Sequence, residues 1–261
     1  MPKRIGVSTS LFASPLFSRL RPPGPCGPFL VSADVPAALA IKLREKSLDA
    51  AFLSPIDYAR EYQMYGIMSD CCAAAGAGAP GAVIMFRDQL RSVRSLAVSP
   101  ASASEIILAD LIFREQFGGP PSLIPFLGTP EDGLAKADGV LCVGDDALRI
   151  RNEGRPLFDL TGEWVAGTDL PFVHGIWVSR PEALTGAEIR FLGESRDEGV
   201  AAISADSAHG PYLSTFTYTL DDTATASLSE FFRLAYYHGI LADLPDLRLL
   251  FRDSTAAPAV N

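Results

Sequence analysis

The stretch from residue 35 to residue 63, VPAALAIKLREKSLDAAFLSPIDYAREYQ, decides the class of fold. A helical pattern over 35–46 is followed by the apolar run LDAAFLS and then by a second helical pattern. Upstream, the run RIGV at 4–7 has the character of a buried strand. Short apolar runs that alternate with helices are typical of βαβ units around a parallel sheet. The sequence therefore predicts an α/β fold.

The helix over 35–46 is indicated by its start signals. Asp34 is the predicted N-cap, and Pro36 stands in the first turn, where its fixed φ suits a helix. Ala38, Leu39, Ile41 and Leu43 supply a mostly apolar face. This face predicts that the helix packs on the neighbouring strands.

A second cycle of the same kind begins after the run GAVIMF at 81–86. It comprises predicted strands at 96–99, 122–126 and 139–144, with predicted helices at 102–117 and 130–137. A further apolar strand is predicted at 170–179, and the remainder is expected to be mostly helical around 225–241. If the chain returns there to the first unit, two α/β lobes are joined by two crossing strands with a cleft between them. We expect lobe one to comprise 1–87 and 175–261, and lobe two 88–174.

The run CCAAAGAGAPGA at 71–82 is the one compositionally biased segment. We interpret it as a small-residue strand and turn that packs closely against a helix, with a ligand-facing turn as the alternative.

Composition narrows the class of partner. The chain has 261 residues, of which 48% are hydrophobic and 20% charged, and its formal net charge is −9. Nucleic acids and acidic membranes attract basic surfaces, so the acidic balance argues against both. A small molecule is the favoured partner. We also keep a homodimer open as the assembly.

Targeting and redox signals are weak. The first seventeen residues superficially resemble a signal peptide, but hydroxyl residues interrupt the apolar run, so we expect a cytoplasmic protein. No apolar stretch approaches the ~20 residues that span a bilayer. The four cysteines have neither disulfide-framework nor metal-ligand spacing, so we interpret them as small apolar residues.

The first candidate site is the stretch VSTSLFASPLF at 7–17, which follows the first strand. In a parallel α/β lobe, that loop lies at the carboxyl edge of the sheet, where ligands bind. Ser10 and Ser14 can line an anion site at a helix start, or they can simply cap the helix.

Two further loops occupy equivalent positions. In SPASASE at 99–105, Ser102 and Ser104 precede Glu105 and can hold a carboxylate or cap the next helix. In VGDDALR at 143–149, Gly144 permits close backbone approach, and Asp145 or Asp146 can accept a substrate hydrogen bond or act as a base. The alternative for the aspartates is an ordinary helix cap.

His174 is the histidine predicted nearest the cleft, within the apolar strand at 170–179. It is either a catalytic group or a hydrogen-bonded core residue. His209 and His238 lie in other segments, so we expect no three-histidine metal site.

Five segments together resemble the chorismate dehydratase family of the futalosine route to menaquinone. They are RIGV…SPLF, LREKSLDAAFLSPIDYAR, VLCVGDDALR, FDLTGEWVAGTDLPFVHGIWVSR and FFRLAYYHGIL, and the resemblance covers about residues 4–251. Its most specific parts are Gly-Asp-x-Ala-Leu at 144–148 and the pattern from Asp159 to Trp177.

The resemblance implies a fold like the type II periplasmic binding proteins. It also implies a lyase that removes water from chorismate to give 3-enolpyruvylbenzoate, with neither metal nor organic cofactor. The expected partner is thus a chorismate-like carboxylate, and the predicted catalytic residues are Asp145 and His174. The predicted cleft residues are Ser10, Phe12, Ser14, Ser54, Ala82, Ser102, Ala103, Ser104 and Gly144.

The chain departs from the family pattern at positions expected to face the ligand. Phe12 stands where the family usually has asparagine, and Ala82 where it has serine. The run 102–104 replaces Arg-Thr-Ser, and His174 replaces the second phenylalanine of a Phe-Val-Phe pattern. The alternative hypotheses are therefore a non-catalytic binding protein for a small aromatic or carboxylated ligand, and a paralogue with another substrate.

Overall fold

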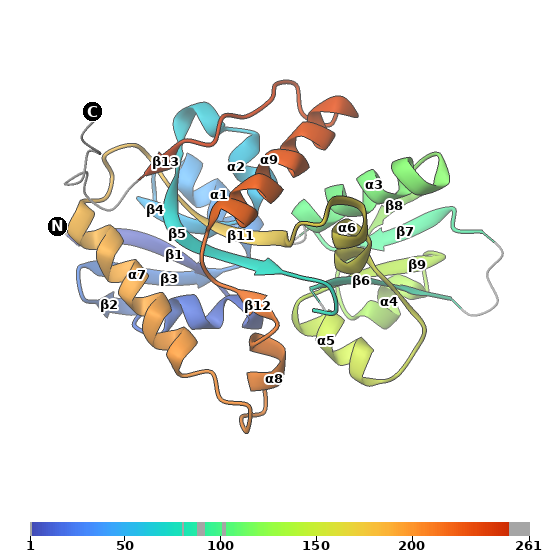
Figure 1. Ribbon diagram of the computed structural model, residues 1–261, viewed down its shortest axis with the longest axis horizontal. Coiled ribbons are helices and arrows are strands. Elements are labelled where there is room, and N and C mark those ends of the chain that lie inside the picture. Colours follow the sequence, from blue (N-terminus) through green and yellow to red (C-terminus); the bar gives the residue numbers. More distant parts are fainter. Residues whose placement is uncertain (1, 80, 88–91, 101–102, 251–261) are drawn as a thin grey trace, which may run out of the picture.

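The computed structural model describes residues 2–79, 81–87, 92–100 and 103–250. Its strands form two separate sheets, and helices cover both. Figure 1 shows the two resulting lobes side by side. The prediction of two α/β lobes is confirmed.

Lobe one is built on an eight-stranded sheet in the order β12-β5-β11-β4-β1-β3-β2, with β13 beside β5. Its strands are β1 (Lys3–Ser8), β2 (Gly24–Cys26), β3 (Phe29–Asp34), β4 (Ala50–Leu53), β5 (Gly66–Ala75), β11 (Phe172–Ser179), β12 (Phe216–Thr217) and β13 (Leu249–Leu250). Its helices are η1 (Leu11–Phe17), α1 (Pro36–Arg44), α2 (Pro55–Ala59), η2 (Tyr62–Met64), α7 (Gly186–Ala201), α8 (Gly210–Leu213) and α9 (Asp222–Tyr237).

The centre of this sheet follows from the sequence pattern. Strand β1 pairs in parallel with β3 and β4, because α1 carries the chain from β3 across β1 to β4. Strand β11, in contrast, runs antiparallel to β4 and β5. The sheet is therefore mixed, since the chain returns to lobe one from the opposite direction.

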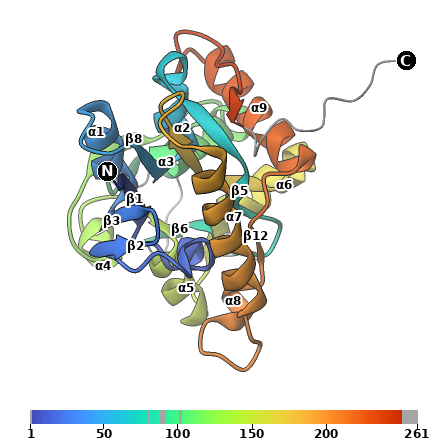
Figure 2. The same ribbon diagram turned by 90° about the vertical axis from the view of Figure 1, so that its left-hand side faces the viewer.

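Helices cover the two faces of this sheet unequally. Helices α1, α2 and α9 pack on one face, whereas α7 and η1 lie on the other (Figure 2). Alternate strand residues supply the two cores: Leu53 and Ile176 face one side, and Phe52 and Trp177 face the other.

Lobe two contains a five-stranded sheet in the order β10-β6-β9-β7-β8. Its strands are β6 (Ala82–Phe86), β7 (Ser95–Val98), β8 (Ser122–Pro125), β9 (Gly139–Val143) and β10 (Leu157–Asp159). Its helices are α3 (Ala103–Phe117), α4 (Pro130–Leu134), α5 (Asp145–Asn152) and α6 (Leu160–Thr168). Strands β7, β8 and β9 are parallel, and β6 is antiparallel to its neighbours.

The chain crosses between the sheets twice, after β5 and before β11. Strand β6 pairs with β9 and β10 of lobe two, so the expected boundary at 87 lies too late in the chain. Likewise, all of β11 belongs to the sheet of lobe one, so residues 172–174 do not belong to lobe two. The apolar runs predicted the strands but not which sheet each one joins.

One hydrophobic core extends across both lobes. It includes Ile56 of α2 and Phe231 of α9 in lobe one, together with Leu108 of α3 and Trp164 of α6 in lobe two. Helices α2 and α9 contact α3 directly. The lobes are therefore packed together on this side.

Candidate functional site

A cavity of about 170 Å³ lies between the lobes. Lobe one contributes residues that follow β1, β3 and β4, and lobe two contributes residues that follow β7, β8 and β9. Its lining comprises Ser10, Phe12, Val35, Pro36, Ser54, Ser99, Glu105, Phe126, Gly128, Leu141, Val143, Asp146 and His174. The carboxyl edges of both sheets therefore meet here, as the position of ligand sites in α/β folds leads one to expect.

The lobe-one wall is formed by the start of η1. Ser10 is the N-cap residue of η1, yet its side chain makes no capping hydrogen bond. Helix α7 holds η1 in place, because Ser195 Oγ donates to the carbonyl oxygen of Leu16 at 3.0 Å. Gly199 makes this packing close, since a Cβ there would lie 1.8 Å from the carbonyl oxygen of Pro15.

Phe12 closes this wall with a buried ring. Only 4% of the residue is exposed, and its ring stacks on Phe216 with a centroid distance of 5.6 Å. It also contacts the His174 ring at 5.5 Å. The ring thus packs into lobe one and presents an apolar edge to the cavity.

Glu105 and His174 form a buried pair in the cavity wall. Glu105 lies in the first turn of α3, and His174 lies on β11. The Nδ1 atom of His174 lies 2.8 Å from Oε1 of Glu105, with side-chain exposures of 0% and 5%. His174 is thus a hydrogen-bonded core residue that also lines the cavity, and its catalytic role stays a prediction.

Ser54 and Asp57 lie beside this pair at the start of α2. Ser54 Oγ donates to Oδ2 of Asp57 at 2.7 Å. Burial raises the pKa of Asp57, and the nearby Glu105 carboxylate raises it further, whereas the Ser54 hydrogen bond opposes the shift. The Asp57 and Glu105 carboxyl groups are therefore both largely shielded from water.

In the VGDDALR stretch at 143–149, the two neighbouring aspartates have different surroundings. Asp146 lines the cavity, and desolvation raises its pKa. Asp145 instead accepts a hydrogen bond from the backbone N–H of Leu11 at 3.0 Å, across the cleft. Gly144 is the N-cap of α5 with a φ of +59°, and a Cβ added there would lie 3.3 Å from the Phe12 ring, so the position suits glycine.

Other predicted cleft residues have structural partners. Ser104 is fully buried, and its Oγ accepts a hydrogen bond from the N–H of Ile56 at 3.0 Å. The N–H of Ala82 donates to Thr161 Oγ1 at 3.2 Å. Ser14 is exposed, and Ala103 packs against the shared core. These four residues, with Asp145 and Gly144, do not line the cavity, and Ser102 lies outside the described residues.

Several lining residues escaped the sequence analysis. Val35 and Pro36 follow β3, and Phe126 and Gly128 follow β8. The rule that ligands bind beyond the carboxyl ends of strands points to both loops. These four residues were not predicted, because the candidate site residues were chosen mainly for hydroxyl and acidic side chains.

The charge of the lining is one-sided. Within the described ranges, it contains Glu105 and Asp146 but neither lysine nor arginine, and His174 is its single basic group. The part of the chain that the structure describes also brings together no group of three His, Cys, Asp or Glu side chains able to hold a metal ion.

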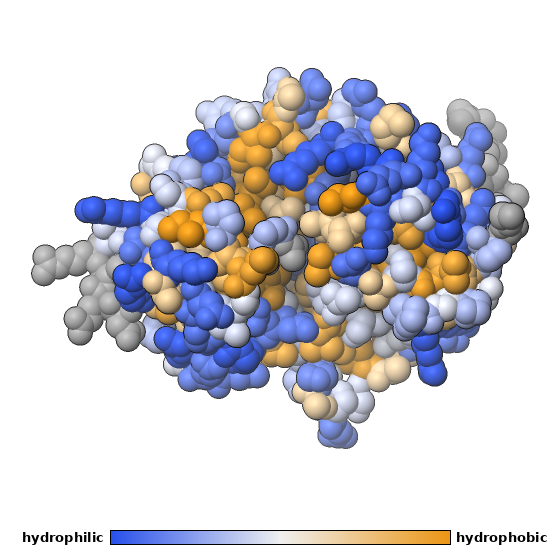
Figure 3. All heavy atoms as spheres, turned by 180° about the vertical axis from the view of Figure 1, so that it is seen from behind, coloured by the Kyte–Doolittle hydropathy of each residue, from blue (hydrophilic) through white to orange (hydrophobic). Residues whose placement is uncertain are grey.

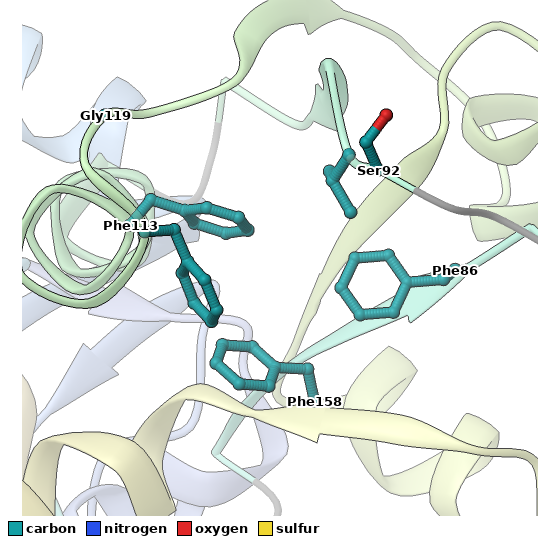
Figure 4. A pocket seen from close by; sticks show the side chains of 7 residues that line it. Phe86, Ser92, Phe113, Gly119 and Phe158 are labelled. Carbon is teal, nitrogen blue, oxygen red and sulfur yellow. The ribbon is translucent and has the colours of Figure 1, made fainter.

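A second cavity, of about 470 Å³, lies in lobe two away from the cleft. The rings of Phe86, Phe113 and Phe158 face one another around it (Figure 4). Its lining carries no charged side chain among the described residues. Among its described lining residues, this cavity therefore offers no side chain for acid–base chemistry, whereas the inter-lobe cavity does.

The fold and its cleft define the class of protein. An alkanesulfonate-binding protein of Xanthomonas axonopodis pv. citri superposes with a TM-score of 0.66 at 12% identity, over 95% of this chain and 98% of its own. A Candida albicans protein, described as having the generic periplasmic binding protein fold, superposes with a TM-score of 0.60 at 14% identity, over 96% of each chain. The chain therefore has the periplasmic-binding-protein fold, and its cavity lies between the two lobes.

The sequence comparisons are more specific. A family model described as menaquinone biosynthesis matches residues 3–237, so the chain belongs to this family. A chorismate dehydratase of Thermus thermophilus is 26% identical over 227 residues, which cover 77% of this chain and 79% of that protein. The predicted family is confirmed. In the described residues, no helix has the length and apolar character needed to cross a membrane.

Proposed function

We propose that the protein is a chorismate dehydratase-like lyase that works in the cleft between its lobes. The observation that carries the proposal is the buried Glu105 carboxylate in the cavity wall, held by His174 at 2.8 Å. Membership of the menaquinone biosynthesis family and the similarity to a chorismate dehydratase support the choice of substrate.

The reaction is an elimination of water that balances without an oxidant or reductant. A base takes the proton of one ring carbon, and the electron pair of that C–H bond forms a new ring double bond. The C–O bond on the neighbouring carbon breaks, and the departing hydroxyl takes a proton to leave as water. The product ring is aromatic, so the protein mainly has to orient the substrate and the proton transfers.

The described residues provide a group for each proton transfer. Glu105 is the base in this proposal. Asp146 lines the same cavity and is the acid for the leaving hydroxyl in this proposal; desolvation raises the pKa of its carboxyl group, whereas Arg149 opposes the shift. Ser10 supplies a hydroxyl group that can bind a substrate carboxylate, whereas the hydroxyl hydrogen of Ser54 is used by Asp57.

The test is incubation of the purified protein with chorismate. We expect loss of the diene absorbance and formation of enolpyruvylbenzoate, identified by chromatography and mass spectrometry. Glu105→Gln should slow turnover by about 100-fold or more, the usual contribution of a general base. Glu115→Gln is the matched control, because Glu115 lies on the same helix and also pairs with a histidine, at 2.6 Å from His238. Absence of product from folded protein would contradict the proposal.

A second candidate is a paralogue that binds a less highly charged ligand without turnover. The observation that favours it is the lack of lysine and arginine among the described lining residues, since chorismate carries two carboxylates. A thermal-shift series distinguishes the two candidates. If benzamide, a neutral aromatic probe, at 100 times its Kd stabilises the protein by about 2.7 kcal/mol, whereas chorismate neither stabilises it nor is converted, the binding role is supported.

A further inference from the structure

We infer that His174 is a positioning residue that acts through its Nδ1 atom on Glu105, and that Glu105 is the group that meets the ligand. This inference assigns roles within the site of the proposed function and rests on that proposal for the reaction. It reverses the roles that the sequence suggested, where His174 was a predicted catalytic residue and Glu105 a helix-start acid.

The pair itself fixes which imidazole nitrogen carries hydrogen. The proposed role of Glu105 as base requires its carboxylate to be ionised, and an ionised carboxylate only accepts hydrogen bonds, so the Nδ1 atom of His174, 2.8 Å from Oε1, is the donor in this inference. In a neutral imidazole the other nitrogen, Nε2, is then left with a lone pair. The structure thus selects one tautomer through the carboxylate.

The Nε2 atom of His174 lies against the segment that crosses between the lobes. It is buried, and it has no hydrogen-bond partner among the described residues. Gly81 lies against it, since a Cβ on Gly81 would come within 2.2 Å of Nε2. A substrate proton therefore cannot reach Nε2 unless the crossing segment at Gly81 moves.

Aromatic rings hold the imidazole in this orientation. Phe172 meets it edge-on with a centroid distance of 4.9 Å, and Phe12 and Phe216 lie at 5.5 and 6.0 Å. A ring packed on three sides cannot turn Nε2 toward the cavity without displacing its neighbours. It can, however, hold the carboxylate of Glu105 in one rotamer at the cavity wall.

Two substitutions at position 174 distinguish the role of Nδ1 from the role of Nε2. In His174→Asn, the amide nitrogen can take the place of Nδ1 as donor to Glu105, but the variant has nothing at Nε2. In His174→Phe, both are lost while the ring remains. We expect chorismate turnover within about fivefold of the wild type for His174→Asn, and a loss of about 10- to 100-fold, mainly in kcat, for His174→Phe.

The result that overturns the inference is equally specific. If His174→Asn loses as much turnover as His174→Phe, with melting temperatures that show both to be folded, Nε2 is the acting nitrogen. His238→Phe is the control for loss of an imidazole, because His238 pairs with Glu115 outside the cleft.

A second measurement does not depend on turnover. The ¹⁵N shifts of the His174 imidazole should show hydrogen on Nδ1, and Glu105→Gln should change that pattern. Hydrogen on Nε2 alone in the wild type would overturn the inference even if the lyase is active. The expected pattern in a protein that does not convert chorismate would instead uphold the pairing and reject only the proposed reaction.

Discussion

Phe12 is the residue at which the family resemblance and the structure make different predictions. The resemblance places an asparagine there and suggests that Phe12→Asn restores a substrate contact. In the structure the ring is buried and stacks on Phe216, so the substitution places an amide in an apolar niche. We expect a loss of stability of about 3–5 kcal/mol, the usual cost of removing a buried phenylalanine ring.

Urea unfolding measures this effect, and Phe12→Leu is the matched variant. Leucine keeps an apolar side chain and should cost clearly less. Equal losses for the two variants would show that ring stacking, rather than burial of the amide, governs this position.

Asp57 is a second residue whose effect can be tested, through the pH dependence of the stability. Its pKa is raised in the folded protein, chiefly by desolvation, so the folded state binds a proton more tightly than the unfolded chain. Stability from this group is therefore present at low pH and is lost as the pH rises through the raised pKa. Relative to wild type, Asp57→Asn should gain stability over that window, by about 1.4 kcal/mol for each tenfold difference in proton affinity between the folded and unfolded states.

Unfolding curves of both proteins between pH 3 and pH 7 measure this difference. Asp222→Asn is the control, since Asp222 begins α9 and is exposed. A stability difference that stays constant with pH for Asp57→Asn would show that the carboxyl group is better solvated than its burial indicates.

Residue type alone predicted some of the site and missed the rest. Ser10, Phe12, Ser54 and His174 were predicted in the cleft and do line the cavity. Ser104 was equally plausible from the sequence, but its hydroxyl is used by the N–H of Ile56. A serine hydroxyl at a helix start accepts a hydrogen bond from whichever donor lies opposite it. The packing of the lobes decides which donor that is, and the local sequence does not contain this information.

At the scale of elements, side chains in the first turns of two lobe-two helices accept hydrogen bonds from backbone N–H groups in the first turns of two lobe-one helices. The first backbone N–H groups of a helix have no partner within it. Here Asp145 of α5 accepts from Leu11 of η1, and Ser104 of α3 accepts from Ile56 of α2. These two bonds flank the cavity, because Phe12, Glu105 and Asp146 line it beside them.

We predict that these bonds keep the cleft closed. The cavity of about 170 Å³ is smaller than the ~300–1,000 Å³ usual for ligand sites, so binding requires the lobes to part. Asp145→Ala removes one partly exposed bond, worth about 1 kcal/mol, and should speed amide exchange at Leu11 roughly fivefold.

Exchange at Ile56 tests whether the two bonds act together. If they belong to one closing motion, Asp145→Ala should speed exchange there too, although the Ser104 bond is intact. Asp222→Ala, which removes a carboxylate from another helix start, is the control. Faster exchange at Leu11 alone would show a local bond without a role in closure.

The order of helices and strands was accessible to sequence patterns, whereas strand direction and sheet membership were not. The alternation around α1 and β4 predicted a parallel core, which β1, β3 and β4 form. Strand β11 is equally apolar but antiparallel, and no local pattern distinguishes the two directions. Similarly, Asp34 was predicted to cap α1, but the N-cap is Val35, whose own N–H bonds to Asp34 Oδ1 at 2.9 Å.

At the scale of the whole molecule, the surface mixes charged and apolar groups, as the view from behind shows (Figure 3). Large exposed apolar residues such as Leu127 and Tyr237 come from different lobes. A homodimer therefore stays a prediction from the sequence. The overall charge has a clearer consequence, because it acts on any anion that approaches the cleft.

The net charge of −9 and the carboxylates of the cleft should oppose a dianionic ligand. Screening weakens such repulsion, since the Debye length falls from about 30 Å at 0.01 M salt to about 10 Å at 0.1 M. We predict that chorismate binds several-fold more tightly when salt is raised across this range. Asp146→Asn should reduce the salt dependence, because it removes from the lining whatever negative charge that carboxyl group carries in its ionised form.

Calorimetry measures the affinity, and it uses the Glu105→Gln variant so that turnover is suppressed. The effect of Asp146→Asn is then measured by comparing the Glu105→Gln, Asp146→Asn double variant with Glu105→Gln alone. Benzamide is the neutral probe, and its affinity should not change with salt. A site that holds carboxylates with cationic side chains behaves in the opposite way, because salt weakens attraction. Weaker chorismate binding at higher salt would therefore show that a positive group, beyond these lining residues, reaches the ligand when the lobes close around it.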